Sequence, residues 1–228
     1  MKKLLLVLLF TAYMAPGVFA QCEDFDFKKG TTWQWSYYNK KGKFSSKTVQ
    51  KVEEYKSIAN GFEVTLLVVN SDSKGEQMPP QSMVMTCKDG TIYFDMKKFI
   101  PDEYFEDSES DMNIEVKGDN LSMPTDMKPG DRLRDASVSM KIGSSESPMN
   151  MRMTIDIFNR KVEGTETLNT PAGKFECSII SQTIKTKTIV SAEMDSKEWY
   201  SPGVGMIKSE TYRKGKMIGY SILTKFTK

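Results

Sequence analysis

The most distinctive spacing in this sequence belongs to methionines and isoleucines that alternate along one segment. The alternating apolar residues are Met149, Met151, Met153 and Ile155, and polar residues stand between them. A β-strand over this segment would place all four side chains on one face. The sulfurs of the three methionines could bind Cu(I), a soft metal, but the sequence contains no histidine to help complete such a site. We therefore predict no metal here, and either an adaptable apolar face that accepts a ligand such as an acyl chain or ordinary core packing.

Three tryptophans could add an aromatic surface. Trp33 and Trp35 alternate with polar residues, and Trp199 stands beside Tyr200, just before a Pro-Gly turn at 202–203. Such rings could stack on a sugar, or they could lie half-buried as large core residues, which the regular alternation favours. We treat Trp33, Trp35 and Trp199 as candidates for the same ligand-binding face.

The absence of histidine excludes several kinds of enzyme. Ser-His-Asp and Cys-His nucleophilic sites and imidazole-bound zinc all require it. A calcium loop beginning at Asp107 fails, because Met112 and Gly118 stand where an EF-hand needs glycine and a bidentate glutamate. A glycosidase could use two carboxylates, but no pair stands out. We predict no catalytic residue and no cofactor.

The N-terminus has the features of an export signal. Residues 1–20 combine Lys2 and Lys3 with an apolar run and end in a small residue, Ala20, so we predict a signal peptide cleaved near Ala20. The apolar run is shorter than the roughly 20 residues of a transmembrane helix. Without Lys2 and Lys3 the chain has 30 basic and 30 acidic residues, which argues against nucleic-acid binding. Residues 21–228 would form one domain in the periplasm or outside the cell.

Three cysteines, Cys22, Cys87 and Cys177, would remain in the exported chain. An oxidising compartment favours one disulfide and one free thiol. The sequence alone leaves all three pairings open. We favour Cys22–Cys87, which would attach the N-terminus to a strand.

The dominant pattern along the chain is the two-residue alternation of β-strands. Turns with glycine separate many of the strands, as in Lys88-Asp89-Gly90 and Lys214-Gly215. Strands are predicted near residues 32–38, 44–55, 61–70, 82–87, 91–96, 136–142, 149–161, 162–169, 175–190, 204–212 and 217–226. We predict an all-β fold with a single strongly curved antiparallel sheet, or open half-barrel, and at most one short helix near 96–106.

Two sequence blocks carry a family resemblance. Thr170-Pro171-Ala172-Gly173 and Trp199-Tyr200-Ser201-Pro202-Gly203-Val204-Gly205 both contain turn residues. With them, essentially the whole of residues 21–228 resembles the TapB-like exported proteins of Gram-negative bacteria, a subgroup of a domain family of unknown function. The resemblance implies an open half-barrel sheet whose concave face can be apolar. It also implies a tetratricopeptide-repeat protein as a partner, and it supplies no catalytic residues.

The functional prediction is binding without catalysis. We expect an exported cell-envelope protein that holds an apolar or lipid-like ligand or partner on its curved sheet. The first alternative is a structural or assembly protein that docks another envelope protein. A carboxylate-dependent hydrolase comes third.

Overall fold

The described part of the chain forms one antiparallel sheet of 13 strands. The computed structural model describes Cys22 and residues 25–95, 112–144 and 151–228, so the predicted signal peptide and the predicted helix near 96–106 lie outside the described residues. The strands are β1 (Thr32–Asn39), β2 (Phe44–Ile58), β3 (Gly61–Asp72), β4 (Gln81–Lys88), β5 (Thr91–Phe94), β6 (Met112–Gly118), β7 (Leu121–Pro124), β8 (Ala136–Ser144), β9 (Met151–Thr170), β10 (Gly173–Lys187), β11 (Ser191–Ser201), β12 (Gly205–Arg213) and β13 (Lys216–Thr227). The prediction of an all-β chain with a single antiparallel sheet is confirmed.

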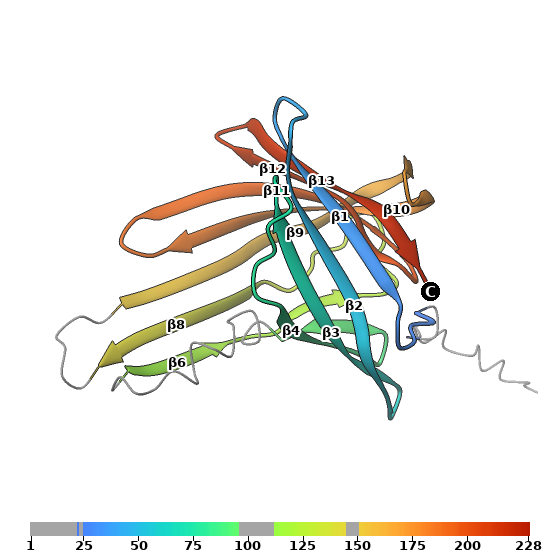
Figure 1. Cartoon of the computed structure of the whole chain (residues 1–228), viewed down its shortest axis with the longest axis horizontal. Helices are drawn as coiled ribbons and strands as arrows, with labels where there is room; N and C mark the ends of the chain where they lie inside the picture. Colours follow the sequence, from blue (N-terminus) through green and yellow to red (C-terminus); the bar gives the residue numbers. More distant parts are fainter. Residues whose placement is uncertain (1–21, 23–24, 96–111, 145–150) are drawn as a thin grey trace, which may run out of the picture.

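The sheet stays open, although its two edges are joined by the chain. The strand order is β6-β8-β9-β10-β11-β12-β13-β1-β2-β3-β4-β5-β7, which makes β6 and β7 the edges. Only Asp119 and Asn120 separate these two strands in the sequence. The sheet must therefore curl until its edges approach each other, and Figure 1 shows β1 to β4 running at a steep angle to β6, β8 and β9.

Two of the predicted hairpin turns have the expected backbone geometry. Asp89 and Gly90 have φ of 49° and 71°, and Lys214 and Gly215 have φ of 50° and 70°. Positive φ at both central residues is the geometry of a two-residue hairpin loop whose twist matches the flanking strands. These turns set the pairing of β4 with β5 and of β12 with β13.

Several strand boundaries differ from the prediction. The strands predicted at 149–161 and 162–169 form one strand, β9, whose ladder shifts register near Asn159, a residue with φ of 56°. Such a bulge breaks the alternation without ending the strand, which explains the wrong division. The strand predicted at 175–190 ends at Lys187, and a separate strand, β11, follows. The edge strands β6 and β7 were not predicted from the sequence.

The main hydrophobic core combines residues from both halves of the sheet. Fully buried side chains include Val64 of β3, Ile180 of β10 and Leu223 of β13. A smaller cluster forms around Val138 and Ile157, near the β6 edge. Within the described ranges, no helix has the length and apolar character that crossing a bilayer requires.

Candidate functional site

An apolar cavity of about 290 Å³ lies on the concave side of the curled sheet. Met85 of β4 and Met123 of β7 line it together with Ser178 of β10 and Tyr200 of β11. In the strand order β4 and β7 lie far from β10 and β11, so the cavity exists because the sheet curls. Among the described residues that line it, none carries a charge at neutral pH. The cavity therefore has the apolar lining of a small-molecule binding site and a volume at the lower end of the usual range.

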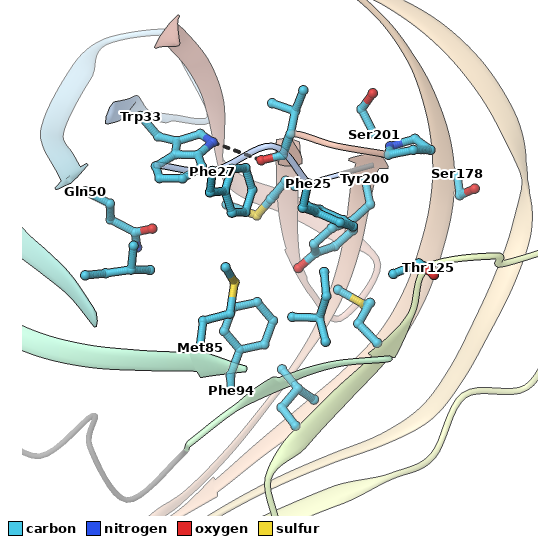
Figure 2. Close-up of a pocket in the computed structure, with 18 of the residues that line it drawn as sticks. Phe25, Phe27, Trp33, Gln50, Met85, Phe94, Thr125, Ser178, Tyr200 and Ser201 are labelled. Carbon is cyan, nitrogen blue, oxygen red and sulfur yellow. Dashed lines mark hydrogen bonds between the residues drawn. The ribbon is translucent and has the colours of Figure 1, made fainter. Parts of the chain in front are cut away.

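Trp33 and Trp35 line this cavity, as Figure 2 shows for Trp33. Each indole Nε1 donates a hydrogen bond of 2.9 Å to a backbone carbonyl, Trp33 to Val204 and Trp35 to Met206. Val204 of the Pro-Gly-Val-Gly block noted in the sequence and Met206, which follows that block, therefore supply the two acceptors. Since the indole N–H groups are already bonded, the two rings present apolar surface to the cavity.

The N-terminal segment supplies another wall. Figure 2 shows the rings of Phe25 and Phe27 across the cavity from Met85 and Phe94. Phe27 meets Trp33 edge-to-face, with 4.8 Å between the ring centroids. Such aromatic pairs add to the stability that burial provides. The segment thus packs as part of the core next to the cavity.

A disulfide anchors this segment to the sheet. In the structure Cys22 is bonded to Cys87 of β4, with an S–S distance of 1.99 Å. Cys177 of β10 is left as a buried free thiol. The bond holds the start of the folded chain against the strand that carries Met83 and Met85.

The free thiol of Cys177 is expected to react very slowly in the folded protein. Burial and the nearby Glu166 carboxylate raise the pKa of this thiol to about 11. About one thiol in a thousand is then ionised at pH 8, and the thiolate is the reactive form. With 5,5′-dithiobis(2-nitrobenzoate), we expect little reaction within minutes in the native state and one thiol per chain after unfolding in guanidinium. Rapid reaction of the native protein would contradict the buried placement.

The methionines that line the cavity are not those that the sequence pattern singled out. They are Met83, Met85, Met123, Met127 and Met206. Of the predicted face, Met149 lies outside the described residues and Met151 begins β9. Met153 is half-buried, and Ile155 packs against the smaller cluster near the β6 edge. Neither Met153 nor Ile155 is among the described residues lining the cavity.

Trp199 is likewise absent from the described cavity lining, while its neighbour Tyr200 is present. The Trp199 Nε1 donates to Glu166 Oε2 at 2.7 Å, and the Lys208 Nζ lies 4.4 Å from the ring centroid. These contacts place the indole in a cation–π arrangement between charged side chains. Because successive strand residues point to opposite faces, Tyr200 reaches the cavity and Trp199 does not.

A buried polar network borders the cavity and was not anticipated from the sequence. Arg160 Nε donates to Gln182 Oε1 at 3.0 Å, and Gln182 Nε2 donates to Glu198 Oε1 at 2.9 Å. Glu198 also accepts hydrogen bonds from Ser196 Oγ and from Tyr200 Oη. Burial and the Glu198 carboxylate raise the pKa of Tyr200 well above its usual value, so its hydroxyl stays protonated. Through Tyr200, this network forms part of the cavity wall.

Carboxylates gather at a second hollow, of about 410 Å³, beside β8 and β9. Asp119, Asp135 and Asp156 contribute to its lining. Hydrogen bonds from Ser137 and Lys187 lower the pKa of Asp156. A glycosidase acid requires the opposite shift. In the described part of the chain, no three His, Cys, Asp or Glu side chains are grouped to hold a metal ion, and residues 107 to 111 of the rejected calcium loop lie outside it.

Two of the solved structures with a similar fold are of bacterial proteins. An exported protein of Bacteroides fragilis with a YmcC-like fold is 26% identical, with a TM-score of 0.69 over 88% of this chain and 97% of that chain. A lipoprotein of Parabacteroides distasonis is 24% identical, with a TM-score of 0.70 over 90% of this chain and 98% of that chain. No curated protein matches the sequence significantly.

The family assignment rests on a match over most of the chain. The family model described as DUF3108-like matches residues 28–223. This range takes in every strand of the sheet from β1 to most of β13, and with them the described lining of the cavity except Phe25 and Phe27. The chain therefore belongs to the DUF3108-like family.

Proposed function

We propose that this protein is exported and binds a lipid-like apolar ligand in the cavity on the concave side of its sheet. The observation that carries the proposal is the cavity itself, with a volume of about 290 Å³ and an uncharged lining among the described residues. A volume near the lower end of the range for ligand sites suits one acyl chain better than a multi-chain lipid.

The chemistry of the lining supports an apolar chain. Five methionines contribute flexible, polarizable side chains that can adjust to ligands of different shape. Trp33 and Trp35 add rigid apolar surface, and we retain both as ligand contacts. Most of the described lining is apolar, which suits an acyl chain better than a sugar. Its side chains with hydroxyl or amide groups are Tyr37, Gln50, Thr125, Ser178, Tyr200 and Ser201.

Export is supported from two directions. The similar Bacteroides fragilis protein is described as exported. The disulfide between Cys22 and Cys87 suits an oxidising compartment. We propose cleavage near Ala20 and a location in the periplasm or outside the cell. We further propose that the protein belongs to the TapB-like subgroup and has a tetratricopeptide-repeat protein as a partner.

Docking of another envelope protein has less support from the surface. Such a function needs a continuous exposed apolar patch. The large exposed apolar side chains are instead distributed over β2, the β3–β4 connection, the β10–β11 turn and β13, and they include Met78, Ile189 and Ile218. Ligand binding is therefore the better-supported function.

Filling part of the cavity is expected to weaken ligand binding. Met85 is buried and lines the cavity, so a Met85→Trp variant would occupy part of its volume. The neutral fluorophore N-phenyl-1-naphthylamine is the probe, and its emission rises in apolar surroundings. We expect Met85→Trp to weaken its binding by about tenfold or more, which corresponds to 1.4 kcal/mol.

Met78→Trp is the matched control, since the same substitution is made at a side chain that is 56% exposed and outside the described cavity lining. It should bind the fluorophore as the wild type does. Circular dichroism melting verifies that both variants fold. Equal binding by folded Met85→Trp and wild type would refute the cavity as the site. Mass spectrometry of an organic extract of the purified protein then identifies any lipid that co-purifies.

A further inference from the structure

The strongest unexplained feature is a buried guanidinium beside the cavity. Arg160 of β9 is 2% exposed. Its Nε donates to Gln182, and its Nη1 donates to the carbonyls of Ser122 at 2.9 Å and Arg134 at 2.7 Å. Oxygen acceptors therefore satisfy Nε and Nη1.

The remaining nitrogen, Nη2, has a poor partner. Among the described residues its acceptor is the Sδ of Met123, at 3.6 Å. A thioether is a weak acceptor, and Nη2 carries two of the five guanidinium N–H groups. Buried charges in proteins are normally paired and fully hydrogen-bonded. The Arg160 side chain thus retains hydrogen-bonding capacity at a place where water is excluded.

Two carboxylates among the described residues attract the charge of Arg160, those of Glu198 and Asp135. The carboxylate of its network belongs to Glu198, which it reaches through the neutral amide of Gln182. Glu198 is already shared with Ser196 and Tyr200. A further anionic oxygen at Nη2 would form a charge-assisted hydrogen bond, which is about twice as strong as a neutral one.

Nη2 contacts a flexible side chain that lines the cavity. Met123, its sulfur acceptor, lines the cavity, as does Tyr200 from the same network. Methionine has three rotatable side-chain bonds, so a change of rotamer at Met123 would open Nη2 to a ligand in the cavity. The apolar lining would hold the chain of that ligand, while Arg160 would hold its head.

We infer that the ligand is a single-chain amphiphile with a carboxylate head group, which replaces the Met123 thioether as the acceptor for Arg160 Nη2. This inference rests on the proposed function, since it names the class of ligand for the same cavity. Arg160 then selects acids over neutral lipids of equal chain length. Since the chains compared are equal in length, the difference in affinity comes from the head group. Burial strengthens this contact because no water competes for the guanidinium.

The test compares three ligands with one chain length on the full wild-type protein. Decanoate, decanol and decyltrimethylammonium each compete with N-phenyl-1-naphthylamine. We expect decanoate to bind about 10- to 100-fold more tightly than decanol, as for a hydrogen bond to a charged group, and the ammonium compound to bind most weakly. Equal affinity for decanoate and decanol would overturn the inference and leave apolar ligand binding intact. A lack of displacement by all three would overturn both.

Arg160→Gln removes the guanidinium and keeps an amide beside Gln182. This variant should lose the preference for decanoate over decanol. Arg134→Gln is the matched control, because it removes an equal charge from a neighbouring side chain that is 72% exposed, and it should retain the preference. If Arg160→Gln does not fold, NMR of the arginine side-chain N–H groups in the wild type tests whether decanoate contacts Arg160. Decanoate should shift the Arg160 resonances, and an unchanged spectrum at saturating decanoate would refute the contact.

Discussion

Replacing Arg160 with methionine is expected to lower the free energy of unfolding by about 3 to 5 kcal/mol, the usual cost of breaking a buried charged network. The variant keeps an apolar side chain of similar length but loses every hydrogen bond of the guanidinium. Gln182 Oε1 and the Ser122 carbonyl lose their donor, and the half-buried Glu198 carboxylate loses the cation that it attracts. The expected loss is larger than for Arg160→Gln, which keeps a polar partner for Gln182.

The large expected loss of stability follows from the position of Arg160 between the two edges of the open sheet. Ser122 belongs to β7, one edge of the sheet, whereas Arg160 belongs to β9, near the other edge. The backbone of the β7–β8 connection pairs with the same stretch of β9, where Leu133 N donates to Arg160 O and Val162 N donates to Asp131 O. Arg160 therefore links two ends of a sheet that no continuous ladder joins.

Urea unfolding, followed by tryptophan fluorescence, measures the free energy of unfolding and so tests this prediction. Arg134→Met provides the control, since its side chain is 72% exposed, and its stability should stay within about 0.5 kcal/mol of the wild type. A loss of less than about 1 kcal/mol in Arg160→Met would show that the network contributes no more than an ordinary hydrogen bond.

Removing the disulfide is expected to cost about 4 kcal/mol, because Cys22 and Cys87 are 65 residues apart and closing a loop of that length restricts the unfolded chain strongly. The double variant Cys22→Ser/Cys87→Ser should also release the segment that carries Phe25 and Phe27. Urea unfolding gives the stability. Limited trypsin digestion at the exposed Lys28 and Lys29 reports the release of the segment.

Cys177→Ala controls for the loss of a buried sulfur, because it removes a thiol and no covalent link. We expect it to cost about 1 kcal/mol, as for a small core truncation, and to leave the rate of tryptic cleavage unchanged. Cleavage of the double variant at the wild-type rate would show that ring packing holds the segment without the disulfide.

The all-β class and the hairpins could be read from the sequence because both depend on local properties. Alternation requires only neighbouring residues, and a turn such as Asp89-Gly90 or Lys214-Gly215 is specified by residues that tolerate positive φ. Trp33 and Trp35 could also be identified as one face of β1, and the structure places both on the cavity. Similar reasoning failed for β9, where the bulge at Asn159 interrupts the alternation within a single strand.

The composition of the cavity was decided by the tertiary structure. Met83 and Met85 alternate as Met151 and Met153 do, so the sequence offers no reason to prefer one pair. The curl of the sheet brings β4, β7 and β11 around one space and leaves Met153 of β9 outside the described lining. Which apolar face becomes a cavity therefore depends on the path of the whole sheet.

The polar network is equally a product of the tertiary fold. Arg160 meets partners that are 22 to 38 residues away in sequence, on β10, on β7 and in the β7–β8 connection. No spacing rule connects these positions, and an arginine within a β-strand ordinarily indicates a solvent-exposed side chain. The sequence by itself determined the all-β class, most of the central strands, two hairpin turns and the aromatic face of β1, because those features depend on a few adjacent residues. The cavity, its methionines and the buried guanidinium were decided only when the sheet curled and brought distant strands together.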